Sequence, residues 1–244
     1  MSDSTFTSKI RDKAKALCLN VAFPDAEDIR TIKTAVVLRD EKIAKPMLIG
    51  NALNITKLAA DNGIGLNGIE IIDPAVSEFK TEFTELLYEK RKAKKMTIEQ
   101  AAELISQPLY FAGLLLETGR AKAVVGGNVS STGDVIRAAI YTVGVADGIS
   151  IVSSYFIMVL GERLLCFADC AVNPDPNDTQ LADIAISSAR NFRAVTGEEP
   201  KIAMLSFSTK GSASHPHIDK VISATNIVKE KAPELMVDGE MQAD

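Results

Sequence analysis

Short apolar runs that alternate with helical stretches are the feature of this sequence that most limits its fold. Three runs, at residues 21–24, 47–50 and 69–72, flank two stretches, 26–40 and 52–62, whose apolar residues recur at helical spacing. The interval between runs approaches the roughly thirty residues of a strand–helix–strand unit. Buried strands that are each followed by a helix are typical of parallel sheets. The sequence therefore predicts an α/β fold.

A largely helical segment follows at residues 75–119. It contains Thr97-Ile98-Glu99-Gln100, the pattern of a helix-initiating capping box. A further strand is expected at residues 123–125, and after Gly126-Gly127 a helix should begin at Ser131-Thr132.

The pattern changes near Gly144. Two β-rich apolar runs, 149–159 and 164–168, surround Gly161-Glu162 and predict a hairpin. Helices and strands are then expected at residues 179–196, 202–205, 218–231 and 235–237. We therefore expect an N-terminal α/β domain at residues 1–147 and a second α/β domain at residues 148–244.

Composition excludes several classes of protein. Among 244 residues, 27 are basic and 32 acidic, and the net charge of −5 argues against a nucleic-acid binder. Apolar residues make up 46%, which excludes bulk disorder. No run of eighteen apolar residues is present, so no membrane span is expected.

Cysteine usage indicates a reducing compartment. The three cysteines, Cys18, Cys166 and Cys170, are too few for a disulfide framework. The first eleven residues lack the apolar core of a signal peptide. A cytoplasmic location is therefore expected. Cys166 and Cys170 have no second pair and the only histidines are His215 and His217, so reduced thiols are favoured over zinc and no metal site is predicted.

The first candidate site follows the strand at residues 123–125. Gly126-Gly127 allows a sharp turn, and Ser130, Ser131 and Thr132 follow where a helix exposes unpaired N–H groups. This arrangement suits a phosphate or carboxylate, with Arg137 one to two turns further on. An ordinary helix N-cap explains the hydroxyls equally well. Neither a Walker A loop nor a complete G-x-G-x-x-G is present.

The second candidate site follows the strand at residues 202–205. Its polar residues are Ser206, Ser208, Thr209, Lys210, Gly211 and Ser212. Hydroxyls and one lysine around a glycine suit a phosphate, and open α/β sheets bind ligands at the ends of their strands. A solvated polar loop is the alternative.

Two other segments remain open. The cations of Lys90-Arg91-Lys92 with Lys94-Lys95 are typical of a solvated helix face, although Arg91 could reach an anion. Asp169 stands at a strand end and either caps a turn or lines a site. His215 and His217 flank Pro216 and are expected at the surface, and no Ser/His/Asp or Cys/His constellation is persuasive.

Five ordered segments together resemble the phosphate acetyltransferase (phosphotransacetylase) family over nearly the whole chain. They are Tyr88-Glu89-Lys90-Arg91-Lys92, Val129-Ser130-Ser131-Thr132 with Ile136-Arg137, Phe167-Ala168-Asp169-Cys170-Ala171-Val172-Asn173-Pro174, Leu205-Ser206-Phe207-Ser208-Thr209-Lys210-Gly211-Ser212, and Val237-Asp238-Gly239-Glu240-Met241-Gln242. The resemblance implies two α/β domains with an isocitrate/isopropylmalate dehydrogenase-like architecture and an interdomain cleft.

The resemblance also implies an activity, the reversible transfer of acetyl between coenzyme A and inorganic phosphate. Coenzyme A and acetyl phosphate would meet in a ternary complex, with a base that deprotonates the thiol and arginines that stabilise phosphate charge. Arg91 and Arg137 match such arginines, and Ser130, Ser131, Thr132 and the loop from Ser206 to Ser212 match segments that line the cleft. The ligands implied are acetyl-CoA or CoA, phosphate and acetyl phosphate, with no tightly bound cofactor, and a homodimer is expected.

The chain departs from the family pattern at two places. Lys95 stands where the family usually has glycine. The family's segment with the base, a serine and an arginine has no match here, so the second domain is expected to be incomplete at its C-terminal end and the 244-residue chain to be inactive alone. The alternatives are a non-catalytic acetyl-CoA-binding regulatory domain, a phosphate butyryltransferase and a decarboxylating dehydrogenase of related fold, although the last would need clustered metal-binding aspartates that are not found.

Overall fold

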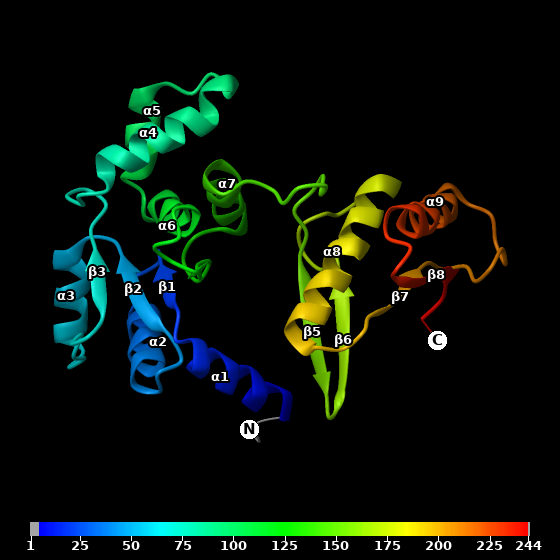
Figure 1. Ribbon diagram of the computed structural model, residues 1–244, viewed down its shortest axis with the longest axis horizontal. Coiled ribbons are helices and arrows are strands. Elements are labelled where there is room, and N and C mark those ends of the chain that lie inside the picture. The colour runs from blue at the N-terminus through cyan, green and yellow to red at the C-terminus, as the bar shows by residue number, and fades with distance from the viewer. Residues whose placement is uncertain (1–4, 244) are drawn as a thin grey trace. The chain divides into compact units, whose positions relative to one another are not determined.

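The computed structural model describes residues 5–243 as two compact units (Figure 1). One unit comprises residues 11–144, and the other comprises residues 145–243 with residues 5–10. The first helix, α1 (Thr5–Leu17), has no buried residue and was not predicted from the sequence.

The unit of residues 11–144 is built on a four-stranded parallel sheet. Its strands are β1 (Asn20–Phe23), β2 (Lys45–Ile49), β3 (Glu70–Ile72) and β4 (Ala123–Val124), in the order β3-β2-β1-β4. Ala22 of β1 pairs with Met47 on one side and Val124 on the other. The predicted α/β class and parallel strands are confirmed.

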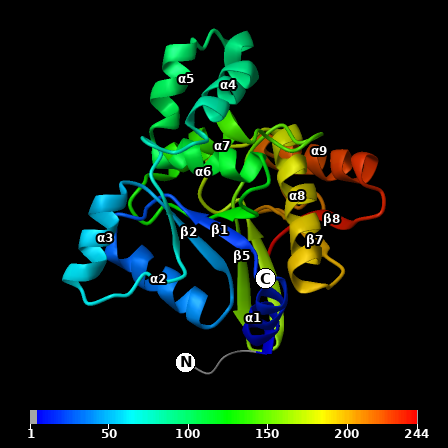
Figure 2. The same ribbon diagram turned by 60° about the vertical axis from the view of Figure 1, so that its left-hand side comes forward.

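Helices cover both faces of this sheet because successive strand residues point to opposite sides. Phe23 and Leu48 pack against α2 (Ile29–Asp40) and α3 (Ala52–Asp61). Ala22 and Met47 face the opposite way, into a core shared with later helices. Figure 2 shows α2 and α3 on one side of β1 and β2, and α6 on the other.

The second helical layer consists of α4 (Lys80–Arg91), α5 (Ile98–Ile105), α6 (Pro108–Glu117) and α7 (Thr132–Thr142). A 3₁₀ turn, Lys92–Lys94, follows α4 directly. Helix α6 lies at the centre of this layer, because its residues from Tyr110 to Leu115 are all buried. The predicted capping box of α5 is confirmed: Thr97 accepts from Gln100 N, and the Gln100 side chain accepts from Thr97 N.

The unit of residues 145–243 contains two small sheets. β5 (Tyr155–Leu160) and β6 (Arg163–Ala168) form the predicted antiparallel hairpin. β7 (Lys201–Leu205) and β8 (Met236–Met241) pair in parallel and are connected through α9 (Pro216–Lys231). Helix α8 (Asp178–Thr196) shares a core with α9 and β7, in which Ile186, Val228 and Met204 are buried.

Three of the boundaries that differ from the sequence prediction have a cause in hydrogen bonding. Helix α2 begins at Ile29 rather than residue 26, because the Asp28 side chain accepts from Arg30 N and caps it. Strand β5 begins at Tyr155 rather than residue 149, because Ser154 hydrogen-bonds Asp169 and not a neighbouring strand. Strand β8 extends to Met241 because it pairs with β7 along that length.

Helices α6 and α7 approach closely at Gly113. A methyl group built on Gly113 would lie 2.2 Å from Thr142 Oγ1 and 2.9 Å from Thr142 Cβ. Thr142 is fully buried, and its hydroxyl donates to Ala138 O. The absence of a side chain at Gly113 therefore sets how closely α7 packs on α6.

Gly113→Ala should lower the free energy of unfolding by about 1–3 kcal/mol, because overpacking a close helix contact displaces buried atoms. Urea unfolding at neutral pH would measure the loss. Gly133→Ala is the matched control, since Gly133 is also helical and a methyl group there would meet its nearest atom, Ser131 Oγ, at 3.9 Å. The control should match the parent or gain up to about 1 kcal/mol. Equal stability of Gly113→Ala and the parent would contradict the close approach.

Candidate anion-binding site

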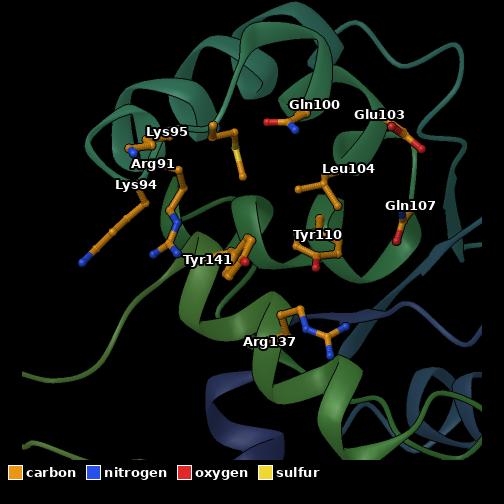
Figure 3. A pocket seen from close by; sticks show the side chains of 11 residues that line it. Arg91, Lys94, Lys95, Gln100, Glu103, Leu104, Gln107, Tyr110, Arg137 and Tyr141 are labelled. Atoms are coloured by element: carbon orange, nitrogen blue, oxygen red, sulfur yellow. The ribbon is translucent and has the colours of Figure 1, made fainter.

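A pocket of about 550 Å³ lies among the helices of the second layer (Figure 3). The end of α4, the following turn, α5, the start of α6 and α7 all contribute to it, so it belongs wholly to residues 11–144. Its lining residues are Arg91, Lys94, Lys95, Met96, Gln100, Glu103, Leu104, Gln107, Tyr110, Arg137 and Tyr141.

The lining is strongly cationic. It includes two arginines and two lysines against the single carboxylate of Glu103. The chain as a whole has a net charge of −5, so this local excess of positive charge is the opposite of the average. Such a concave cationic surface concentrates anions and favours phosphate or carboxylate ligands.

Arg91 ends α4 and stacks on Tyr141 of α7. Its Cζ lies 4.1 Å from the centroid of the Tyr141 ring, within the range of a cation–π contact. Its Nε is buried without a hydrogen-bond partner. The stack holds the guanidinium plane in the pocket wall, where no carboxylate of residues 5–243 pairs with it, so its terminal nitrogens remain available to a ligand.

Arg137 lies one helical turn before Tyr141, and residues four apart share a helix face. Its Nη1 lies 3.0 Å from Asp134 Oδ1 in an ion pair whose two side chains are more than half exposed. An exposed pair of this kind contributes little stability, so a doubly charged anion could replace Asp134 as partner at low cost.

The run of cations from Lys90 to Lys95 divides into two groups. Lys90 pairs with Glu117 and Lys92 with Glu89, as expected of a solvated helix face. Lys94 and Lys95 instead line the pocket. Lys95 adopts a φ of 65°, a left-handed conformation that favours glycine, which gives a physical reason for the glycine expected at this place in the family pattern.

Asp25 fixes the start of α7. It follows β1, while residues 126–130 follow the neighbouring strand β4, so parallel pairing brings both to one sheet edge. The Asp25 carboxylate accepts hydrogen bonds from Gly127 N at 2.7 Å, Asn128 N at 3.1 Å and Ser130 N at 3.3 Å, and from the Ser130 hydroxyl. Burial by itself would raise the pKa of Asp25, but these hydrogen bonds favour the carboxylate and hold the pKa below its ordinary value.

One protein-family model covers nearly the whole chain. The family model described as phosphate acetyl/butaryl transferase matches residues 5–244. The chain belongs to this family. A curated phosphate acetyltransferase from Thermoanaerobacterium thermosaccharolyticum is 43% identical over 241 residues, covering 96% of this chain and 73% of its own length.

Solved structures of the family agree. A phosphotransacetylase from Streptococcus pyogenes superposes with a TM-score of 0.93 at 34% identity, over 100% of this chain and 74% of its own. The EutD phosphotransacetylase from Staphylococcus aureus gives a TM-score of 0.88 at 36% identity, over 97% of this chain and 72% of its own. The resemblance inferred from the sequence is therefore confirmed.

The two arginines predicted from the family pattern meet in the pocket. Arg91 and Arg137 come from α4 and α7 and both line it. Ser130, Ser131 and Thr132 do not line it. Ser130 is bound to Asp25, Ser131 caps α7 by accepting from Asp134 N at 3.2 Å, and Thr132 is exposed. Substrate binding by these three hydroxyls stays a prediction.

The loop from Ser206 to Ser212 belongs to the other unit and is tied to β8. The buried Glu240 carboxylate accepts from Gly211 N at 2.6 Å and from the Ser208 hydroxyl at 3.3 Å. Lys210 pairs with Asp238 and donates to Gly239 O at 3.0 Å. Thr209 N donates to Ser212 Oγ at 3.0 Å, and Ser206 N to Met241 O. Phosphate binding here also stays a prediction.

Asp169 acts as a turn cap. Its carboxylate accepts from the Ser154 hydroxyl at 2.6 Å, Ala171 N at 2.8 Å and Asn173 Nδ2 at 2.6 Å. Burial alone would raise its pKa, and these hydrogen bonds lower it far below its ordinary value. His215 likewise has a structural place, since it caps α9 by accepting from His217 N.

No group of three His, Cys, Asp or Glu side chains within residues 5–243 could hold a metal ion. None of the helices in that range is long and apolar enough to cross a bilayer.

Sequence reasoning missed Asp25, Tyr110 and Tyr141. Two signals were available: Asp25 directly follows a buried strand beside Pro24, and Tyr141 stands four residues after Arg137 on an expected helix. Tyr110 carried no comparable signal, because an aromatic residue in an apolar helix is normally part of the core.

Asp25→Asn should lower the free energy of unfolding by roughly 2 kcal/mol at pH 7, because an amide cannot accept from all the donors that converge on the carboxylate. The folded-state pKa of Asp25 is depressed, so its contribution is present above the unfolded pKa of about 3.9 and is lost as pH falls further. The difference between parent and variant should therefore shrink between pH 7 and pH 3 in urea unfolding.

The exposed Asp61 supplies the control. Asp61→Asn should change stability by less than about 0.5 kcal/mol at both pH values. A stability gap for Asp25→Asn that stays constant from pH 7 to pH 3 would contradict the role given to the carboxylate.

Proposed function

We propose that this protein is a phosphate acetyltransferase, which catalyses acetyl-CoA + phosphate = CoA + acetyl phosphate. The observation that carries the proposal is the cationic pocket that Arg91 and Arg137 both line, in a chain 43% identical to a phosphate acetyltransferase. A non-catalytic acetyl-CoA-binding domain is the alternative, and it would bind coenzyme A without transferring acetyl.

The chemistry requires charge stabilisation at phosphate. The CoA sulfur bonds to the carbonyl carbon of acetyl phosphate, the carbon–oxygen bond to phosphate breaks, and phosphate leaves with its negative charge while a base takes the thiol proton. Arg91, held by Tyr141, and Arg137 would hydrogen-bond the phosphate oxygens as that charge develops. Tyr141 orients the Arg91 guanidinium before the substrate arrives, whereas Arg137 would exchange Asp134 for the ligand.

Further parts of the proposal extend beyond the pocket. Domains 1–147 and 148–244 would adopt an isocitrate dehydrogenase-like arrangement with a cleft between them. The cleft would be lined by hydroxyl-rich segments of both domains: Ser130, Ser131, Thr132, Ser206, Ser208, Thr209, Lys210, Gly211 and Ser212. Coenzyme A would act as a substrate, with no tightly bound cofactor. A homodimer in the cytoplasm completes the proposal.

Residues 1–244 by themselves should transfer acetyl slowly. In the described chain the pocket's titratable groups are two arginines, two lysines, two tyrosines and Glu103. Glu103 is the one carboxylate among them, and Figure 3 shows its side chain directed away from Arg91. A positioned base typically contributes a factor of about 10² to 10⁴ in rate.

The function is tested by calorimetry and by a thioester-absorbance assay of CoA with acetyl phosphate or butyryl phosphate. The 244-residue protein should bind CoA and phosphate, prefer acetyl phosphate, and turn over at least 10²-fold more slowly than the Thermoanaerobacterium thermosaccharolyticum relative assayed alongside. Failure to bind both ligands would contradict the function, and turnover equal to the relative's would contradict the slow transfer. Faster reaction of butyryl phosphate would reassign the acyl group.

Arg137→Ala should weaken phosphate binding or lower the transfer rate at least tenfold, about 1.4 kcal/mol, because one of two guanidinium groups is lost. Calorimetry with phosphate and the thioester assay would measure the two effects. Lys33→Ala is the control, since Lys33 is an exposed cation of α2 outside the pocket. Unchanged binding and rate in Arg137→Ala would remove Arg137 from the site.

A further inference from the structure

Tyr110 is a buried aromatic residue in the first turns of α6 that also lines the pocket. Its side chain is 6% exposed and belongs to the core beneath the pocket. Its ring meets the Tyr141 ring edge to face, with centroids 5.9 Å apart. Because Tyr141 in turn carries Arg91, the two tyrosines and the arginine form one continuous contact across α6, α7 and α4.

The Tyr110 hydroxyl has no hydrogen-bond partner within residues 5–243. Figure 3 shows its oxygen directed toward the side of the pocket that the Arg137 guanidinium occupies. The Tyr110 ring is buried, but its hydroxyl oxygen is not among the buried polar atoms that lack a partner. Here the hydroxyl opens onto the pocket, so a ligand in the pocket can supply that partner.

We propose that the Tyr110 hydroxyl donates a hydrogen bond to a phosphate-type oxygen of the ligand held by Arg91 and Arg137. The proposal deepens the proposed function and rests on it. It makes Tyr110 a third anion-binding residue of the pocket, and the only one of the three that is uncharged.

The chemistry of the three groups is complementary. Two guanidinium groups supply charge and bidentate geometry, and a tyrosine hydroxyl supplies one directed donor that can bind a third oxygen of a tetrahedral phosphate. The hydroxyl remains a donor at neutral pH, because burial raises the pKa of Tyr110 even though the positive charge of Arg137 partly opposes the shift.

The contacts distinguish ligand binding from a structural role. A structural hydroxyl would bond to the protein, and its removal would destabilise the fold. The Tyr110 hydroxyl makes no such bond in the described chain, so Tyr110→Phe keeps the buried ring and its contact with Tyr141 while removing only the donor. The unliganded variant should therefore be at least as stable as the parent.

The test compares Tyr110→Phe with Tyr88→Phe in the 244-residue protein. Tyr88 is a half-buried tyrosine of α4 that does not line the pocket, so the control makes the same chemical change outside the site. Calorimetry would measure dissociation constants for inorganic phosphate, acetyl phosphate, coenzyme A and dephospho-coenzyme A. Thermal unfolding would measure stability with and without 10 equivalents or more of each ligand.

We expect Tyr110→Phe to keep the parent's melting temperature without ligand and to bind at least one of these ligands about tenfold more weakly, as loss of a hydrogen bond to a charged group implies. Tyr88→Phe should bind all four like the parent. Weakening limited to phosphate and acetyl phosphate assigns the oxygen to the transferred group's phosphate, and weakening limited to the coenzyme A forms assigns it to that ligand.

Two results would overturn the inference. One is parent-like binding of all four ligands by Tyr110→Phe. The other is a clear drop in its unliganded melting temperature, which would show a structural hydroxyl. Either result leaves the proposed function standing if the parent binds phosphate and coenzyme A, whereas a parent that binds none of the four overturns both.

Discussion

The candidate site depends on the hydrogen bonds that the Asp25 carboxylate accepts. The donors are backbone N–H groups of the segment after β4, and these bonds fix the point from which α7 starts. Helix α7 carries Arg137 and Tyr141, and Tyr141 in turn holds Arg91 of α4. The position of both arginines therefore depends on one buried acid at the end of β1.

Two other carboxylates of the chain also accept several hydrogen bonds from a turn or loop that follows a strand. Asp169 caps the turn after β6, and Glu240 binds the loop after β7. In each case converging N–H and O–H donors form a site for negative charge, and a carboxylate of the chain already occupies it. By contrast, Arg91 Nε is buried without a partner and the Tyr110 hydroxyl bonds to no group of the described chain, and both residues line the pocket. Unsatisfied donors beside a cationic cavity indicate a ligand more directly than hydroxyl-rich loops do.

The sequence predicted the secondary structure and the family well for physical reasons. Strands that are buried on both faces form continuous apolar runs in the sequence. Asn51, Thr97 and Ser131 have side chains that cap helix N-termini, so the starts of these helices can be recognised from a few neighbouring residues. Helix α1 was missed although Phe6, Ile10 and Leu17 recur at helical spacing, and it buries no residue. Arg91 and Arg137, selected from the family pattern, both line the pocket, and their catalytic role stays a prediction. The sequence analysis did not select Tyr110 or Tyr141.

By itself the sequence determined the α/β class, the alternation of strands and helices that builds a parallel sheet, and the family, because all of these follow from local periodicity and ordered motifs. Only the tertiary structure decided which charges remain free. Lys90 forms an ion pair with Glu117 and Lys92 with Glu89, whereas Lys94 and Lys95 line the pocket. Residues as distant in sequence as Asp25 and Ser130 became bonded because parallel strands end at the same sheet edge. Pairing and burial are properties of neighbours in space, and spacing along a chain does not specify them.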